Sequence, residues 1–304
     1  MIAILGAGSL GRLWAASLPA QSAAFVPRPG ALPGDPVRFE FQNLAGATLN
    51  ATVPWLTDCS QVDLLLVMTK AGDTLNAIAD VADKLPENAP VVLFQNGLGS
   101  QQAVAERWPE RPVLAASTTD GANRPSEHRV VHAGAGETWL GALTDAGQAQ
   151  VQPVINRLRS SGLTLHPEPD ILARLWQKLV INAGINPFTA LLDCPNGDLL
   201  TEDLFLSHID GLCTELAQLM TADGQGQVSP ADLRHRIETV ARNTARNTSS
   251  MRADVQNRRR TEIDFINGYL VRLGQRLGIA TPVNQLLAER VQQLSNHQQE
   301  HPHG

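Results

Sequence analysis

The sequence lacks a long basic run, a long apolar run and a cysteine pattern, and each absence excludes a class of protein. Lys and Arg number 24 against 30 Asp and Glu, so the formal net charge is -6. The one basic cluster, Arg258–Arg260, is interpreted as a solvated helix face, so we expect no nucleic-acid partner. The apolar stretch Val62–Met68 contains Asp63 and is far too short to cross a bilayer, so we expect no membrane partner.

Cysteine is scarce, and its spacing matches no metal site. The three cysteines indicate reduced, packed thiols of a cytoplasmic protein, and no metal is expected. They are Cys59, Cys194 and Cys213. The chain has 304 residues, 43% of them hydrophobic and 18% charged, which is typical of a globular protein with two domains. Because an apolar strand begins at Met1, we expect no signal peptide.

A glycine loop directly follows this first strand. The apolar run Met1–Leu5 leads into a GxGxxG pattern, and Arg12–Leu18 continues as a helix. In this context the first glycine permits a tight turn, the second lets the backbone approach a pyrophosphate, and the third lets helix and strand pack closely. The helix N-terminus offers free N–H groups to the phosphates. We therefore predict a dinucleotide site, with an ordinary turn as the alternative. Its residues are Gly6, Ala7, Gly8, Ser9, Leu10 and Gly11.

The second strand favours one type of dinucleotide. NAD-binding folds usually place a carboxylate at the end of this strand, on the ribose 2′-hydroxyl. Here the strand ends at Arg28, and no carboxylate follows before Asp35. A guanidinium suits a 2′-phosphate, so the sequence predicts NADP(H) as cofactor. The alternative is an ordinary surface arginine.

The rest of the N-terminal half alternates strands and helices. We expect strands at 61–68, 90–94 and 113–119, helices at 74–85 and 100–108, and short strands at 129–132 and 137–140 that close the edge of the sheet. This order predicts a Rossmann-like, doubly wound parallel sheet in an α/β fold. Ligands bind beyond the carboxyl ends of such strands, which points to Lys70, Asn96 and the turn Asp120–Ala122.

Beyond about residue 168 the apolar periodicity is only helical. Helices are expected to open at Pro169, Thr201 and Ser229, to run from Thr261 to Leu277, and to follow Pro282. We therefore predict a Rossmann-like domain at 1–167 and an all-α domain at 168–304. The polar, His-rich tail from about residue 296 is expected to lack structure.

One stripe in the helical half could carry chemistry. Lys178, Asn182 and Asn186 recur every fourth residue, so on a helix they fall within about 80° of one another. The plain interpretation is the solvated face of an amphipathic helix. The neighbouring Trp176, Leu179, Val180, Ile181 and Ile185 leave little solvated surface. A partly desolvated lysine has a lowered pKa and can act as a general acid near neutral pH.

Taken together, the segments at 175–197, 259–270, 6–11, 95–99 and 247–251 resemble the ketopantoate reductase (2-dehydropantoate 2-reductase) family, and the resemblance covers nearly the whole chain. Two segments carry most of the resemblance, LWQKLVINAGINPFTALLDCPNG at 175–197 and RRTEIDFINGYL at 259–270. GAGSLG at the N-terminus, the strand before Lys70, QNGLG at 95–99 and NTSSM at 247–251 follow in the family's order. Singly these motifs are weak, and together they are specific.

The resemblance implies NADPH-dependent reduction of 2-dehydropantoate to (R)-pantoate, in the route to pantothenate and coenzyme A. It implies Lys178 as general acid and an α-keto acid as the small-molecule partner of a monomer or homodimer. Implied cofactor contacts, besides the glycine loop, are Arg28, Lys70, Asn96, Ala122 and Glu262. Implied substrate contacts are Asn96, Lys178, Asn182, Asn186, Asn196, Ser250, Met251, Arg252 and Ala253. Where some relatives have bulkier residues, this chain has Asp120 and Gly121. The resemblance therefore does not fix the geometry of the loop near the cofactor.

Plainer interpretations stay open for several of these residues. Glu262 could be a first-turn acid of a helix, Lys70 a surface lysine, and Asn96 a turn former. Ser249 and Ser250 could simply interrupt a helix. Two other functions also stay open: a different NADP-linked hydroxy-acid dehydrogenase, and a non-catalytic NADPH-binding regulator.

Overall fold

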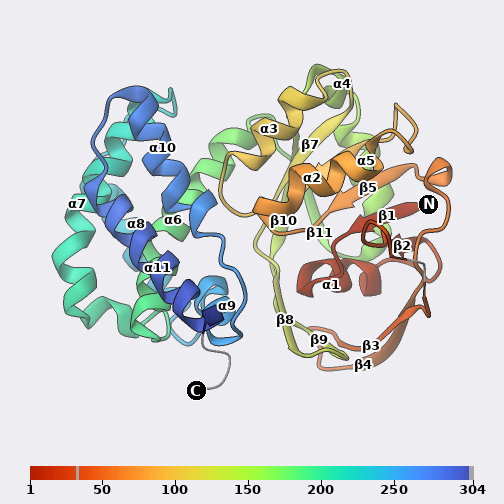
Figure 1. The fold of residues 1–304 in the computed structure, drawn as a ribbon, viewed down its shortest axis with the longest axis horizontal. Helices are drawn as coiled ribbons and strands as arrows, with labels where there is room; N and C mark the ends of the chain where they lie inside the picture. Colours follow the sequence, from red (N-terminus) through yellow and green to blue (C-terminus); the bar gives the residue numbers. More distant parts are fainter. Residues whose placement is uncertain (32–33, 301–304) are drawn as a thin grey trace. The chain divides into compact units, whose positions relative to one another are not determined.

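A computed structural model describes residues 1–31 and 34–300, which divide into two compact units (Figure 1). The first unit comprises residues 1–95 and 100–172. The second comprises residues 96–99 and the chain from Ala173 onward. Four residues that follow a strand of the first unit therefore belong with the helices of the second.

The first unit contains a seven-stranded sheet, in the order β11-β10-β7-β6-β5-β1-β2. Neighbouring strands are parallel except β10 against β7. The strands are β1 (Ile2–Leu5), β2 (Ala23–Phe25), β5 (Leu64–Val67), β6 (Val91–Leu93), β7 (Val113–Thr118), β10 (Glu137–Ala142) and β11 (Thr164–Pro167). The predicted α/β fold with a doubly wound sheet is confirmed.

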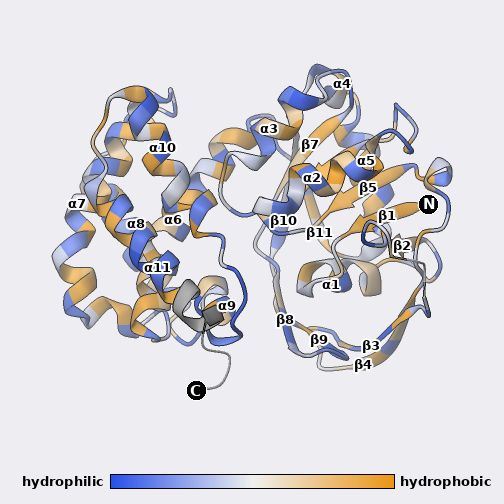
Figure 2. Cartoon of the chain, viewed as in Figure 1, coloured by the Kyte–Doolittle hydropathy of each residue, from blue (hydrophilic) through white to orange (hydrophobic). Residues whose placement is uncertain are grey.

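Helices cover both faces of this sheet because successive side chains of a strand point to opposite sides. Ile2 and Ile4 join a core with α1 (Ser9–Ser17) and α5 (Val151–Leu158). Ala3 and Leu5 join a second core with α2 (Ala71–Ala82) and α3 (Ser100–Arg107). Figure 2 shows these central strands as hydrophobic. A short helix, α4 (Asp145–Gln148), and the 3-10 turns η1 (Cys59–Gln61) and η2 (Arg159–Ser161) complete the connections.

A second sheet corrects one expectation. We expected 129–132 at the edge of the main sheet, but this strand pairs in a separate sheet of order β4-β3-β9-β8. Its strands are β3 (Val37–Gln42), β4 (Thr48–Val53), β8 (Gly121–Ser126) and β9 (Arg129–Gly134). The apolar side chains of this sheet are buried in the core that contains α1. β9 therefore has an apolar partner away from the main sheet. The residues are Phe39, Phe41 and Val130 of the sheet and Leu13 and Trp14 of α1. The edge beyond β10 is taken by β11 instead.

The second unit is helical within the described residues. Its helices are α6 (Ile171–Leu192), α7 (Asp203–Ala222), α8 (Pro230–Asn243), α9 (Ser250–Gln256), α10 (Asn267–Leu277) and α11 (Pro282–Glu300), with 3-10 turns η3 (Asp198–Thr201) and η4 (Ile263–Phe265). Ile171 and Leu172, at the start of α6, belong to the first unit. Phe188 and Phe205 pack edge to face at 5.3 Å between ring centroids in the helical core. None of the helices within 1–31 and 34–300 is both long and apolar enough to span a membrane.

Local signals placed several helix ends, and three expectations need correction. Ser229 caps α8 by accepting a hydrogen bond from the Asp232 N–H, and Gly278 ends α10 at φ 70°. The helix expected from Thr261 is broken, because Ile266 has ψ -97° between η4 and α10. The helix expected from Thr201 begins at Asp203, since Thr201 ends η3. The tail expected to lack structure is helical to Glu300, and residues 301–304 lie outside the described part.

Candidate functional site

The glycine loop leaves an open cradle at the N-terminus of α1. Gly6 has φ 114°, and a Cβ there would lie 2.7 Å from the Met68 backbone. A Cβ on Gly11 would overlap the Gly6 carbonyl oxygen, so α1 packs directly on the loop. Gly8, the N-cap residue of α1, has no atom within 4 Å of where its Cβ would be. Gly6 and Gly11 allow close backbone packing, whereas Gly8 leaves open space beside the N-terminus of α1. This arrangement suits the phosphates of a dinucleotide.

Arg12 holds this loop, although the sequence pattern predicted it only as the start of a helix. Its Nε donates to the Ala7 carbonyl at 3.0 Å and its Nη1 donates to the Glu127 carbonyl. The guanidinium lies 5.2 Å from the centre of the Phe39 ring. Burial, and next the cation of Arg124, lower the pKa of Arg12. An arginine buried on an apolar helix face needs such partners, and its position directly after the third glycine is the signal that could have found it.

The other predicted cofactor residues of the first unit follow strand ends or start β8. Arg28 is exposed three residues beyond β2. Lys70 is the half-buried N-cap residue of α2, and its carbonyl accepts hydrogen bonds from the Asp73 N–H and the Thr74 hydroxyl. Ala122 lies half-buried in β8. The exposure of Arg28 is compatible with both a phosphate contact and an ordinary surface arginine.

Asp120 anchors the start of β8. Its Oδ1 accepts from His132 Nε2 at 2.9 Å and from the Gly136 N–H at 3.1 Å. The hydroxyl of Thr118 donates to Oδ2 at 3.3 Å. The Asp120 and His132 side chains are both buried. A buried carboxylate with several donors holds one geometry, so Asp120 fixes the loop that precedes Ala122.

The QNGLG segment turns sharply after β6. Gln95 is buried, and its Nε2 donates to the carbonyls of Val67 and Thr69 at 3.0 and 3.1 Å. Gly97 has φ 78°, and a Cβ there would overlap the Phe265 carbonyl oxygen. The Leu98 N–H donates to that same oxygen at 2.9 Å. Only glycine allows this approach without strain, so the turn is built to place its neighbour Asn96 against η4.

Within the second unit the structure brings together Asn96, Glu262 and Lys178. Asn96 Nδ2 donates to Glu262 Oε2 at 3.3 Å. Burial lowers the pKa of the half-buried Lys178 to about 8, and the Glu262 carboxylate opposes this shift. Glu262 precedes η4 and lies outside any α-helix, so it is not a first-turn helix acid. The three residues form an amide, a carboxylate and an ammonium with a pKa near neutrality, a set that can bind a polar ligand and deliver a proton.

The remaining asparagines belong to the same helical unit. Asn182 is half-buried in α6, and Asn186 is buried one turn further along. Thr189, on the next turn, lies 2.7 Å from Ser249 between hydroxyl oxygens. Asn196 is buried, with Nδ2 donating to the Thr244 hydroxyl at 2.9 Å. Its Oδ1 has no hydrogen-bond partner among the described residues, which leaves an acceptor for a ligand or water.

The turn at the start of α9 contains the other predicted substrate residues. Ser249 caps this helix by accepting from the Arg252 N–H, so the two serines start a helix and do not interrupt one. Ser250 is exposed, Met251 is buried, and Ala253 is half-buried. Arg252 Nε donates to Asp193 Oδ1 at 2.8 Å. Ser250 is therefore the residue of this turn whose hydroxyl is presented to solvent.

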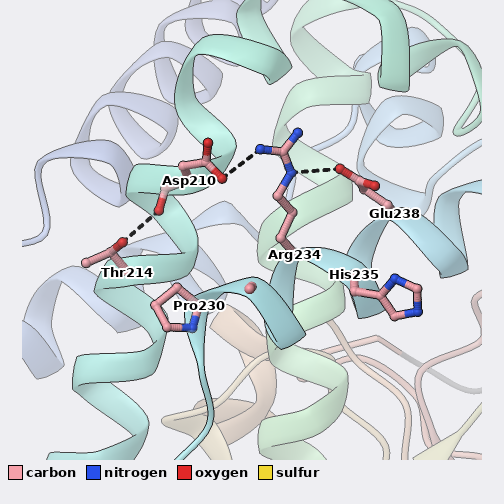
Figure 3. A pocket seen from close by; sticks show the side chains of 7 residues that line it. Asp210, Thr214, Pro230, Arg234, His235 and Glu238 are labelled. Carbon is pink, nitrogen blue, oxygen red and sulfur yellow. Dashed lines mark hydrogen bonds and ion pairs between the residues drawn. The ribbon is translucent and has the colours of Figure 1, made fainter.

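A separate surface pocket lies between α7 and α8 (Figure 3). Its volume is about 530 Å³, and none of its seven lining residues is a predicted site residue. Arg234 spans it and pairs with Asp210 at 2.7 Å and with Glu238 at 2.8 Å. Since the central cation is already paired with two carboxylates, the pocket offers an incoming anion little charge.

Comparisons with known proteins agree on one family. The family model "Ketopantoate reductase PanE/ApbA" matches residues 2–145, and the model of its C-terminal part matches residues 170–295. A 2-dehydropantoate 2-reductase of Vibrio cholerae is 34% identical over 293 residues, covering 96% of this chain and 97% of the relative.

Two solved structures share the fold over nearly the whole chain. A PanE/ApbA family ketopantoate reductase from Ralstonia eutropha has a TM-score of 0.83 at 24% identity, covering 98% of this chain and 99% of the other. A D-mandelate dehydrogenase with NADH and anilino(oxo)acetate has a TM-score of 0.84 at 22% identity, covering 97% and 98%. At these identities the likeness concerns the fold alone.

Proposed function

The chain belongs to the ketopantoate reductase family, and from this premise we propose that it reduces 2-dehydropantoate to (R)-pantoate with NADPH, a step toward pantothenate. The family makes the chain a nicotinamide-dependent oxidoreductase. The proposal adds the phosphorylated cofactor, the substrate and the residues that act. The observation that carries it is the grouping of Asn96, Glu262 and Lys178: Asn96 Nδ2 donates to Glu262 Oε2 at 3.3 Å, and the Glu262 carboxylate acts on Lys178, whose pKa burial lowers to about 8.

Lys178 acts as the general acid. When a keto group is reduced, negative charge develops on its oxygen, and a proton must be delivered there. Lys178 Nζ carries a transferable proton at neutral pH because burial has brought its pKa down to about 8. The ammonium also stabilises the developing charge before the proton moves. Glu262 favours the protonated form of Lys178, since its carboxylate raises the pKa against desolvation.

The cofactor residues are proposed from the cradle and the strand ends. The nicotinamide, when bound, supplies the hydride. The open space at Gly8 and the first N–H groups of α1 suit the pyrophosphate. Arg28 and Lys70 are proposed for phosphate groups, with Arg28 on the 2′-phosphate that distinguishes NADPH from NADH. Ala122, Asn96 and Glu262 are proposed as further contacts.

The substrate residues are proposed from the helical unit. Asparagine amides at 182, 186 and 196 can donate to and accept from an α-keto acid without adding repulsive charge. Ser250 is proposed to hydrogen-bond the substrate carboxylate through its exposed hydroxyl. Met251, Arg252 and Ala253 support the turn, since Met251 is buried and Arg252 is bonded to Asp193.

The test is NADPH oxidation with a panel of α-keto acids. We expect 2-dehydropantoate to have the highest kcat/KM, above phenylglyoxylate, pyruvate and 2-oxoisovalerate. Preference for a ketone without the branched, hydroxylated tail would assign the chain to another hydroxy-acid dehydrogenase. Tight NADPH binding without turnover of any member would indicate a regulator. NADH in a parallel series tests the cofactor.

A further inference from the structure

The helix that carries Lys178, Asn182 and Asn186 contains a proline. Pro187 lies inside α6, directly after Asn186. In an α-helix the carbonyl of residue 183 accepts from the N–H of residue 187, and proline has no N–H. The Ala183 carbonyl therefore lacks its regular donor, at a point between the turns of Asn182 and Asn186. A proline inside a helix favours a kink, both because this hydrogen bond is missing and because its ring crowds the carbonyl of residue 183.

A side chain from another helix supplies the missing donor. Asn267, the first residue of α10, donates through Nδ2 to the Ala183 carbonyl at 3.4 Å. The same Nδ2 donates to Asn284 Oδ1 at 3.0 Å, and both asparagines are fully buried. The Oδ1 of Asn267 has no partner among the described residues. The amide of Asn267 thus donates to two acceptors while its own oxygen stays unpaired, although an unpaired buried acceptor costs stability. Its donor is therefore the group that makes contacts here.

A buried carboxylate determines which way this amide points. Glu215 of α7 accepts from the backbone N–H groups of Val283 and Asn284 at 2.7 and 3.0 Å, and from Asn284 Nδ2 at 2.7 Å. Because Glu215 accepts all three hydrogen bonds, Asn284 turns its Nδ2 toward Glu215 and its Oδ1 toward Asn267. Asn267 must then turn its Nδ2 toward Asn284 Oδ1. The order Glu215, Asn284, Asn267, Ala183 is thus oriented from one end to the other.

We propose that Asn267 is a positioning residue for the reaction, because its amide replaces the N–H missing at Pro187 and so fixes where Asn186 lies relative to Lys178. The proposal rests on the proposed roles of these two residues in substrate binding and proton transfer. Asn267 also begins α10 two residues after η4, which holds the QNGLG turn through Phe265. One side chain therefore connects the segment beside Glu262 with the helix of Lys178.

The kinetic test is rescue by restoring the backbone donor. Asn267→Leu removes the amide at similar volume, and we expect kcat/KM for 2-dehydropantoate to fall between about 10- and 100-fold, because small displacements of positioned groups have effects of this size. The dissociation constant for NADPH should stay within about twofold, since the glycine loop is untouched. Pro187→Ala gives the Ala183 carbonyl a backbone donor. Adding it to Asn267→Leu should recover most of the lost kcat/KM.

A purely structural role gives a different pattern. If Asn267 only joined α10 to α11, Pro187→Ala would not rescue the variant, and failure of rescue overturns the proposal. Gln285→Leu, on the exposed side of α11 next to Asn284, is the matched control and should change nothing. If Asn267→Leu does not fold, Asn267→Ala, which removes the donor without adding bulk, takes its place with the same expectations.

Amide hydrogen exchange separates this proposal from the proposed function. Exchange at residues 184–192 should be faster in Asn267→Leu and return toward the wild-type rate with Pro187→Ala, whatever the substrate. Unchanged exchange overturns the donor replacement. Faster exchange with unchanged kcat/KM overturns the positioning role while the reductase assignment stands. A wild-type enzyme without turnover would instead overturn the proposed function, and exchange would still decide the role of Asn267.

Discussion

The two units prepare their sites in different ways. In the first, the candidate nucleotide site is made of backbone: three glycines, the start of α1, and strand ends. In the second, the candidate chemistry depends on side chains that meet through tertiary packing, such as Asn96 with Glu262, which are 166 positions apart. Backbone sites tolerate changes of side chain but not of glycine. Side-chain sites depend on single functional groups, so substitutions should separate binding from chemistry.

Lys178→Ala is expected to have the largest effect, because it should remove the chemistry and leave cofactor binding intact. Without the proton donor, kcat/KM for 2-dehydropantoate should fall by on the order of 10²-fold or more. NADPH affinity and the melting temperature should stay close to those of the wild type, because the cradle lies in the other unit. Steady-state kinetics, fluorescence titration with NADPH and thermal melting measure the three quantities. Lys84→Ala, an exposed lysine on the C-terminal side of α2, is the control. Near-normal turnover of Lys178→Ala would remove this lysine from its role.

The pH profile should follow the same group. A general acid works in its protonated form, and the pKa of Lys178 lies at about 8. The wild-type kcat/KM should therefore be high below that pH and fall with unit slope above it, about tenfold per pH unit. If Glu262 opposes deprotonation, Glu262→Gln should move this fall to lower pH. A profile that stays level through pH 9 would contradict the assignment.

A pair of glycine substitutions tests the contrast from the backbone side. Gly8→Ala meets no protein atom within 4 Å, so the fold should persist while NADPH binding weakens by roughly 10-fold, about 1.4 kcal/mol. Gly97→Ala would overlap the Phe265 carbonyl at φ 78°, so it should lower stability by about 1–3 kcal/mol and disturb Asn96.

Melting curves and NADPH titrations distinguish the two glycine variants. The contrast holds if Gly8→Ala changes mainly affinity and Gly97→Ala mainly stability and kcat. Equal losses of stability in both would show that Gly8 serves packing, and would return the loop to an ordinary turn.

More of the first site than of the second could be predicted from sequence patterns. The glycine loop could be derived from residues alone, because a strand, three spaced glycines and a helix are all local. The Lys178 stripe could not be told from a solvated helix face without the family resemblance, since its charged partner Glu262 lies far away in the sequence. Asn267 escaped notice for the same reason, because it donates to a carbonyl distant in sequence. Arg12 could have been found from its place after the third glycine, but its bond to the Glu127 carbonyl could not. The second sheet was missed because β3 pairs with β9 across a long separation.

A smaller effect is expected for Arg28→Ala, which concerns cofactor choice. A charge-assisted contact to a 2′-phosphate contributes about 1.5–3 kcal/mol, so the preference for NADPH over NADH should drop by roughly 10- to 100-fold. The kcat with saturating NADPH should change little, because the phosphate lies far from the reacting carbon. Arg38→Ala, an exposed arginine of β3, is the control. An unchanged preference would leave Arg28 as an ordinary surface residue.

The smallest effect is expected at the pocket between α7 and α8, where the arginine at its centre is already paired with two carboxylates. Arg234 is one-third exposed and already bonded to Asp210 and Glu238. Exposed ion pairs contribute about 0–1 kcal/mol, so Arg234→Met should lower stability by no more than about 1 kcal/mol. It should leave kcat/KM and NADPH affinity unaltered, as measured by denaturant unfolding and steady-state kinetics. Asp210→Asn should behave alike, since it removes one half of the same network. A change in kcat/KM beyond about threefold in either variant would mean that this face of the helical unit is coupled to Lys178, because only coupled residues transmit energy beyond their own contacts.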